Sequence, residues 1–457
     1  MKGWTFAFAL LLLGLGACGS LVPAPVPDAP VRATWDNAPP VSTATAAAWP
    51  ARWWQQFHSA QLDALVDNAL RDNPGFAAAA ERLFAARLLQ QAGSAGLKPE
   101  LVLNAAPESA PGATVNYFQA SIDARWEMPL FDRGTNSARI LQAQTADAEA
   151  GVAEVRAALI TEIVRTYLNG RFAADRLVLA EALVQVTAEL QQRVAARVGA
   201  GLEEPEAGLA STQLTRAARL GEDEPRQVRT QCLESLAALL GQAVVSDTWI
   251  DASGSPLELP LPPATVPAEM LRHRPDVQRA ESAMERAAAQ LGIARAELYP
   301  HISIEGALTT ALRLSGGGGV SSIFSAGPII TLPLFDWGLR RAQSEARGAE
   351  LRAATLVYRQ TVLDAVAEAE LAFTQLDAAS QRVAMLTTDA DSAQLAARRA
   401  GTKRELGLLA QVPALDLARD ALLARQALDG ARLEQAIALV HLYAVLGAGT
   451  GLPQGRA

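Results

Sequence analysis

The chain has 457 residues, half of them hydrophobic but only 5% aromatic, so its apolar content is mostly Ala, Leu and Val, a composition that favours helices. A formal net charge of −8, without any marked basic cluster, argues against nucleic acid as a partner. The four histidines and two cysteines are far apart in sequence, which predicts no metal site, and no nucleophile elbow or phosphate loop points to an enzyme or a cofactor.

The N-terminus carries the first predicted element. Lys2 precedes an apolar stretch from Trp4 to Ala17, which is the pattern of a signal peptide. The stretch ends in Leu-Gly-Ala-Cys at residues 15–18, which resembles the lipobox of bacterial lipoproteins. This resemblance implies acylation of the Cys18 thiol and cleavage of the chain before it. It also implies a lipid anchor in the outer membrane, because the residue after the cysteine is Gly19 and not Asp. An ordinary signal peptide followed by a chance cysteine is the open alternative.

Residues 18–50 are rich in proline and predict an extended tether between the lipid anchor and the folded body. The aromatic residues after it (Trp49, Trp53, Trp54 and Phe57) are expected to seat the end of the tether on the first helices. No later stretch reaches about 18 consecutive apolar residues. We therefore expect any membrane-spanning part to be made of strands.

Between Val115 and Met128, polar and apolar residues alternate with a period of two, which predicts a strand with one polar and one apolar face. Ile302 to Glu305 repeat the alternation. In a barrel with a wet interior the apolar residues would face lipid, and the polar ones would line the lumen: Gln119, Ser121, Asp123, Arg125, Glu127, Ser303 and Glu305. A soluble sheet with one wet face is the alternative that alternation alone leaves open.

Two very long helices are predicted after the strand regions. From Gly134 to Gly201 there is no proline and little glycine, and apolar residues recur every three or four positions. Such a helix would be about 100 Å long at about 1.5 Å per residue, so it requires neighbouring helices to cover its apolar face. The interval from Gly338 to Gly407 has the same character.

Matched landmarks predict a tandem duplication. The intervals Pro74–Pro99 and Pro275–Pro300 are both 25 residues, and PLFDRG at 129–134 is matched by PLFDWG at 333–338. The next glycine-to-glycine intervals are 67 and 69 residues, and the last two are both 40. Each unit therefore contains short helices, a β-hairpin, a very long helix and a shorter return helix.

These landmarks divide the chain into consecutive segments. They are the signal peptide 1–17; the tether 18–50; a first repeat 51–250 with a hairpin at about 100–129, a long helix 134–200 and a return helix 206–240; a Pro-rich linker 251–266; a second repeat 267–449 with a hairpin at about 300–334, a long helix 338–400 and a return helix 408–446; and a tail 450–457.

Two hairpins supply four strands, which cannot close a barrel by themselves. An open strand edge in lipid costs several kcal/mol for each unpaired amide, and bacterial single-chain barrels begin at about eight strands. Other copies of the chain must therefore complete the barrel. This argument alone permits a dimer, a trimer or a larger ring.

Three stretches together resemble signatures of the TolC-like outer-membrane efflux proteins, in particular the lipoprotein channels of tripartite, RND-type efflux systems. They are LRHRPDVQRAE at 271–281, GPIITLPLFDWG at 327–338 and VHLYAVLGAG at 440–449. The resemblance implies a mainly α fold with a membrane β part: a homotrimer whose 12-stranded outer-membrane barrel continues into a periplasmic α-barrel. It also implies a periplasmic adaptor and an inner-membrane transporter as partners, and no catalysis.

The resemblance further implies that the periplasmic end closes near the second helix tip, at residues 401–419. Leu415 and Asp416 fall where the family carries a Leu-Asp pair near the aperture, whereas Arg404 stands where the family often has a tyrosine. Pro413 is unexpected and predicts a kink in the return helix. We predict that four residues shape the gate or the adaptor contact: Lys403, Arg404, Glu405 and Asp416. Ordinary solvated charges at a helix end are the alternative.

The sequence therefore predicts a passive export duct for drugs or other small toxic compounds, anchored in the outer membrane and extending into the periplasm. An outer channel for type I protein secretion and a non-conducting envelope scaffold are the alternatives. The exported substrate is not encoded in any recognisable motif of this chain.

Overall fold

The computed structural model describes residues 34–37, 52–108, 117–250, 259–260, 267–314 and 319–451. The predictions on the signal peptide and Cys18, and most of those on the tether, the linker 251–266 and the tail, lie outside these residues. The described chain divides into two units. One is built from Ala80–Gly151 and Asp276–Val362, and the other from Pro30–Ala79, Val152–Pro275 and Leu363–Ala457.

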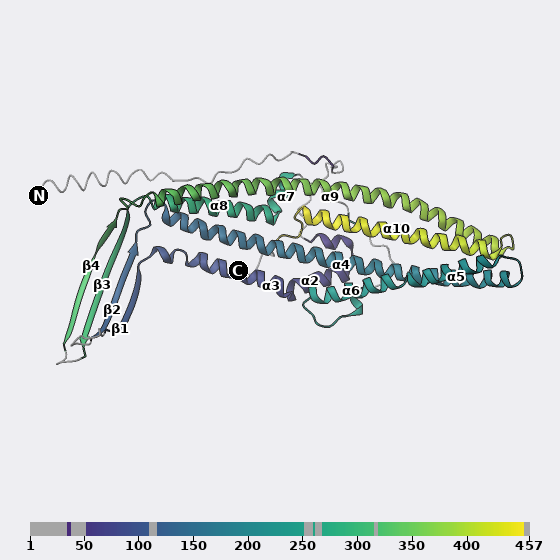
Figure 1. The fold of residues 1–457 in the computed structure, drawn as a ribbon, viewed down its shortest axis with the longest axis horizontal. Coiled ribbons are helices and arrows are strands. Elements are labelled where there is room, and N and C mark those ends of the chain that lie inside the picture. The colour runs from purple at the N-terminus through teal and green to yellow at the C-terminus, as the bar shows by residue number, and fades with distance from the viewer. Residues whose placement is uncertain are drawn as a thin grey trace. The chain divides into compact units, whose positions relative to one another are not determined.

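Most of the described chain is helical, with a small β part (Figure 1). In chain order the elements are η2 (Trp53–Phe57), α2 (Ala60–Asp72), α3 (Pro74–Ala92), η3 (Ala95–Leu97), β1 (Glu100–Glu108), β2 (Tyr117–Glu127), α4 (Arg133–Gly199), α5 (Pro205–Leu220), α6 (Asp223–Leu239), η4 (Asp247–Trp249), α7 (Pro267–His273), α8 (Pro275–Ala296), β3 (His301–Arg313), β4 (Val320–Thr331), α9 (Leu339–Glu405) and α10 (Gln411–Val445). The two long helices α4 and α9 each contain 67 residues. Within the described residues, none of the helices combines the length and the apolar character needed to cross a membrane.

The return helix predicted over 206–240 is in fact two helices, α5 and α6, so this prediction is wrong in detail. The break lies at Gly221, whose amide donates to the carbonyls of Ala217 and Ala218. Pro225 lies in the first turn of α6, where its missing amide hydrogen costs no helical hydrogen bond, whereas in the middle of a continuous helix it would break the ladder. Pro413 likewise lies in the first turn of α10, where its missing amide hydrogen costs no helical hydrogen bond.

Four glycines at equivalent positions of the two repeats close their helices in the same way. Gly407 has a left-handed φ of +72°, its amide donates to Arg404 O, and the next amide, of Leu408, donates to Lys403 O. This pair of bonds is the Schellman motif, which satisfies the last carbonyls of a helix. The same pair of bonds closes the helices that end at Gly201, Gly241 and Gly447.

The residue before each repeat's proline binds the end of that repeat's return helix. The side-chain amide of Asn73 donates to Leu239 O at 2.9 Å, and the guanidinium of Arg274 donates to Val445 O at 2.9 Å. Arg274 also pairs with Glu368 at 2.9 Å. The arginine of the 271–281 signature therefore has a structural role, since it joins the start of α8 to the end of α10.

The core of the second unit gathers around the first aromatic residues. Trp53, Trp54 and Phe57 are buried, as expected for residues that seat the chain on the first helices, and Trp49 lies outside the described residues. Trp53 stacks on Tyr443 with ring centroids 4.8 Å apart, and the Tyr443 hydroxyl donates to Gln56 at 3.0 Å. Burial raises the pKa of Tyr443 to about 12.

The strands form one antiparallel sheet in the order β1-β2-β3-β4 (Figure 1). The two hairpins therefore pair with each other through β2 and β3, and β1 and β4 are the outer strands. The register places Arg125 opposite Glu305 and Ile122 opposite Leu308. Side chains directly opposite each other in a sheet share a face. The polar residues of both hairpins that were predicted to line a lumen therefore lie on one face of the sheet.

Candidate functional site

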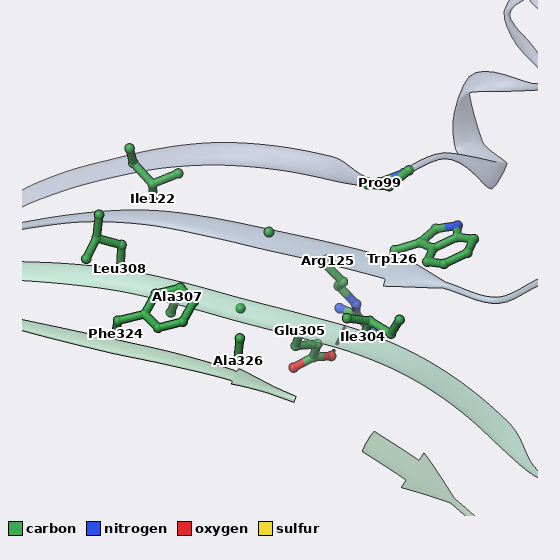
Figure 2. A pocket seen from close by; sticks show the side chains of 12 residues that line it. Pro99, Ile122, Arg125, Trp126, Ile304, Glu305, Ala307, Leu308, Phe324 and Ala326 are labelled. Atoms are coloured by element: carbon green, nitrogen blue, oxygen red, sulfur yellow. Dashed lines mark ion pairs between the residues drawn. The ribbon is translucent and has the colours of Figure 1, made fainter. Parts of the chain in front are cut away.

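One face of the sheet is polar and carries all seven residues predicted to line a lumen. Arg125 on β2 and Glu305 on β3 form an ion pair at 3.6 Å, drawn as a dashed line in Figure 2. Asp123 accepts hydrogen bonds from Asn104 on β1 at 2.6 Å and from Ser121 at 3.0 Å. The structure thus brings residues from three strands into two polar clusters on one face.

The opposite face of the sheet is apolar and exposed. Its side chains include Leu103 on β1, Ile122 on β2, Leu308 on β3 and Phe324 on β4. Ile122 is 48% exposed and Phe324 is 73% exposed, and part of this face forms the hollow in Figure 2. In a soluble sheet with one wet face, protein would cover such a surface, so this exposure argues against that alternative.

A second cluster lies where the strands meet the helices, and the sequence reasoning had missed it. The Arg133 guanidinium at the start of α4 lies 3.1 Å from Glu127 and hydrogen bonds to the ring of His301 at the start of β3. The His301 ring nitrogen is 3.5 Å from Glu127. Arg133 and His301 are 168 residues apart, so only the pairing of β2 with β3 brings them together.

The predicted gate residues fall at the tip between α9 and α10. Lys403, Arg404 and Glu405 are exposed in the last turn of α9. Asp416 lies in α10, where it pairs with Arg419 one turn further on at 3.1 Å. Among the described residues, no ion pair joins Asp416 to the three charged residues at the end of α9; its ion pair lies within α10.

The beginning of α10 is held against α4 by neighbouring residues. Leu415 is buried against Leu190 and Val194 of α4. Gln411 donates a hydrogen bond to Glu189, also on α4. The Leu-Asp pair therefore has two roles: Leu415 packs inward and Asp416 remains partly exposed. Glu189 was not predicted, because nothing local in the sequence indicates its distant partner.

Among the described residues, no group of three or more His, Cys, Asp or Glu side chains is arranged to hold a metal ion. Cys232 is buried on α6, and burial raises the pKa of its thiol, which suits a small hydrophobic residue of the core.

The family profile described as "Outer membrane efflux protein" matches residues 65–242 and 266–448. The chain belongs to the outer membrane efflux protein family. The two matched segments correspond to the two repeats, which supports the duplication inferred from the spacing of prolines and glycines.

Two of the relatives match along most of this chain, and one of them carries an efflux description. The probable efflux pump outer membrane protein TtgC of Pseudomonas putida is 27% identical over 97% of this chain and 95% of its own length. Nodulation protein T of Rhizobium leguminosarum bv. viciae is 27% identical over 82% of this chain and 79% of its own length.

Solved structures share the fold. The outer-membrane channel OprN is similar with a TM-score of 0.80 and 26% identity, over 94% of this chain and 99% of that one. The Neisseria gonorrhoeae channel MtrE, in its open state, has a TM-score of 0.80 at 23% identity, over 94% of this chain and 99% of that one. The predicted resemblance and the fold class, helices with a membrane β part, are confirmed.

Membership of this family makes the chain an outer-membrane efflux channel protein that extends into the periplasm. The family is one of channels and not of enzymes.

Proposed function

We propose that three copies of this chain form the passive exit duct of a tripartite efflux pump for drugs or other small toxic compounds. The observation that supports this most directly is the four-stranded sheet with one polar and one exposed apolar face. Its outer strands β1 and β4 offer edges to further copies, and a closed ring leaves no unpaired edge in lipid.

In this proposal the polar face lines the pore. Gln119, Ser121 and Asp123 of β2 lie on that face, together with Arg125 and Glu127 of the same strand and with Ser303 and Glu305 of β3. Charged groups that line a water-filled pore bias the passage of ions of opposite sign. The network around Asp123 and the Arg125–Glu305 pair would hold these side chains against the wall and keep the passage open.

The helix tips serve as the aperture and the adaptor contact. Lys403, Arg404 and Glu405 are exposed at the end of α9, as a docking surface requires, and Asp416 lies on the first turns of α10. The partners in this proposal are a periplasmic adaptor and an inner-membrane transporter. Relatives described as the outer membrane proteins of efflux pumps support this arrangement. Acylation of Cys18 would add a lipid anchor.

The decisive experiment measures both the conductance of the purified protein and the export of small compounds by cells. Purified protein inserted into planar bilayers is expected to give discrete, long-lived conductance steps, and chemical cross-linking is expected to give a band at three times the monomer mass. Deleting the gene is expected to increase the toxicity of at least one small compound. If deletion changed no compound's toxicity and the protein gave no conductance, the duct would be excluded and an envelope scaffold favoured.

A further inference from the structure

A short N-terminal segment, Thr34 to Asn37, lies against α9 within the second unit. The Trp35 side chain is only 9% exposed although its neighbours on both sides are exposed, and its ring centroid is 5.6 Å from that of Phe373. Phe373 is itself buried. Burial of an aromatic ring against another aromatic ring contributes about 2 kcal/mol or more, enough to hold a short segment in place.

Glu370, one turn before Phe373, receives three hydrogen bonds from the same segment. The backbone amides of Asp36 and Asn37 donate to its carboxylate oxygens at 2.8 and 3.0 Å, and the Asn37 side chain donates at 3.0 Å. Hydrogen bonds to an ionised carboxylate are stronger than those between neutral groups. Because two of the three donors are backbone amides, the bonds also fix the direction of the chain at this point.

We propose that Trp35, Asp36 and Asn37 on one side, and Glu370 and Phe373 on the other, form a latch that fixes the N-terminal segment at one height on α9. The latch does not depend on the proposed acylation of Cys18.

Hydrogen exchange of the full-length acylated protein tests the latch. The amides of Asp36 and Asn37 are expected to exchange at least about 10-fold more slowly than an unstructured peptide, since hydrogen-bonded amides exchange mainly on local opening. Glu370→Ala and Trp35→Ala are expected to abolish this protection. Glu345→Ala, which removes an exposed carboxylate elsewhere on α9, is the control and should leave it unchanged. Unprotected amides in the wild-type protein would overturn the latch.

Discussion

Gly241, at the end of the first return helix, lies directly against the carbonyl oxygen of Asp72. A Cβ atom at Gly241 would be 2.7 Å from that oxygen, and one at Gly447, the equivalent residue of the second repeat, would be 3.0 Å from the carbonyl oxygen of His273. Both glycines have a left-handed φ, of +67° and +76°. The two repeats therefore close on their own first helices through the same backbone contact.

This contact predicts an unequal response to alanine at two similar glycines. Gly241→Ala is expected to destabilise the protein by about 3 kcal/mol, about 1 from the left-handed backbone and the rest from the clash with Asp72. Gly201 has φ +70° but open space around it, so Gly201→Ala, the matched control, should cost only about 1 kcal/mol. Urea unfolding followed by circular dichroism measures both, and equal losses would show that the contact with Asp72 contributes nothing.

The hydrogen bond from Tyr443 to Gln56 predicts a graded effect of two substitutions. Tyr443→Phe keeps the stacking on Trp53 but leaves Gln56 without this donor, and should cost about 1 kcal/mol. Tyr443→Ala also empties the space of the ring and should cost about 3–5 kcal/mol. Thermal unfolding compares them. A loss for Tyr443→Phe as large as that for Tyr443→Ala would contradict stacking as the larger contribution.

A carboxylate pair in the second unit predicts a pH-dependent stability. Burial, together with the charge of Asp429, raises the pKa of Asp175 in spite of Arg171 and Arg425. Burial also raises the pKa of Asp429, against the opposing effect of Arg425 and Arg432. A carboxyl whose pKa is higher in the folded state binds more protons there than in the unfolded state. Stability is therefore lost as pH rises from about 4 through the folded pKa.

Asp175→Asn removes one of these costs. The variant is expected to have a higher Tm than the wild type at pH 7, and the difference should disappear at about pH 3, where the wild-type carboxyl is mostly protonated in both states. Asp377→Asn, at a carboxylate that bonds to Gln381 on the exposed side of α9, is the control and should change Tm little at either pH. A gain that persisted at about pH 3 would have a cause other than titration.

Two neighbouring aspartates of α10 provide a matched test of the gate. Asp416 and Asp420 both contact Arg419, at 3.1 and 2.8 Å, but only Asp416 falls at the position predicted to lie near the aperture. If the Asp416 charge closes the aperture, as we propose, Asp416→Asn should raise single-channel conductance in bilayers several-fold, whereas Asp420→Asn should not. The same conductance for the wild type and both variants would make Asp416 an ordinary surface charge.

Glu305 tests whether the polar face lines the pore. Glu305→Gln removes a negative charge beside Arg125 in each copy, so the channel should shift measurably towards anions, as seen in the reversal potential across a salt gradient. Glu345→Gln, on the exposed side of α9 outside the sheet, is the control. An unchanged reversal potential for Glu305→Gln would place the polar face outside the conducting path.

Much of the architecture can be predicted from local sequence patterns. The alternation of Phe118 to Glu127 predicts a strand with two different faces, and the absence of proline between Gly134 and Gly201 predicts a helix of the observed length. Both follow from backbone periodicity, which a single stretch of chain expresses without its neighbours. The equal intervals to the next landmark proline after Pro74 and after Pro275 likewise revealed the duplication, because repeats are a property of order along the chain.

Other features were decided only by the tertiary structure. The pairing of β2 with β3 brings Arg133 to His301, the packing of α10 on α4 brings Gln411 to Glu189, and the docking of Trp35 on Phe373 joins residues more than 300 positions apart. A local pattern says which face of an element is apolar but not which distant element covers it. That choice depends on shape, register and charge across the whole chain, and it is made only when the chain has folded.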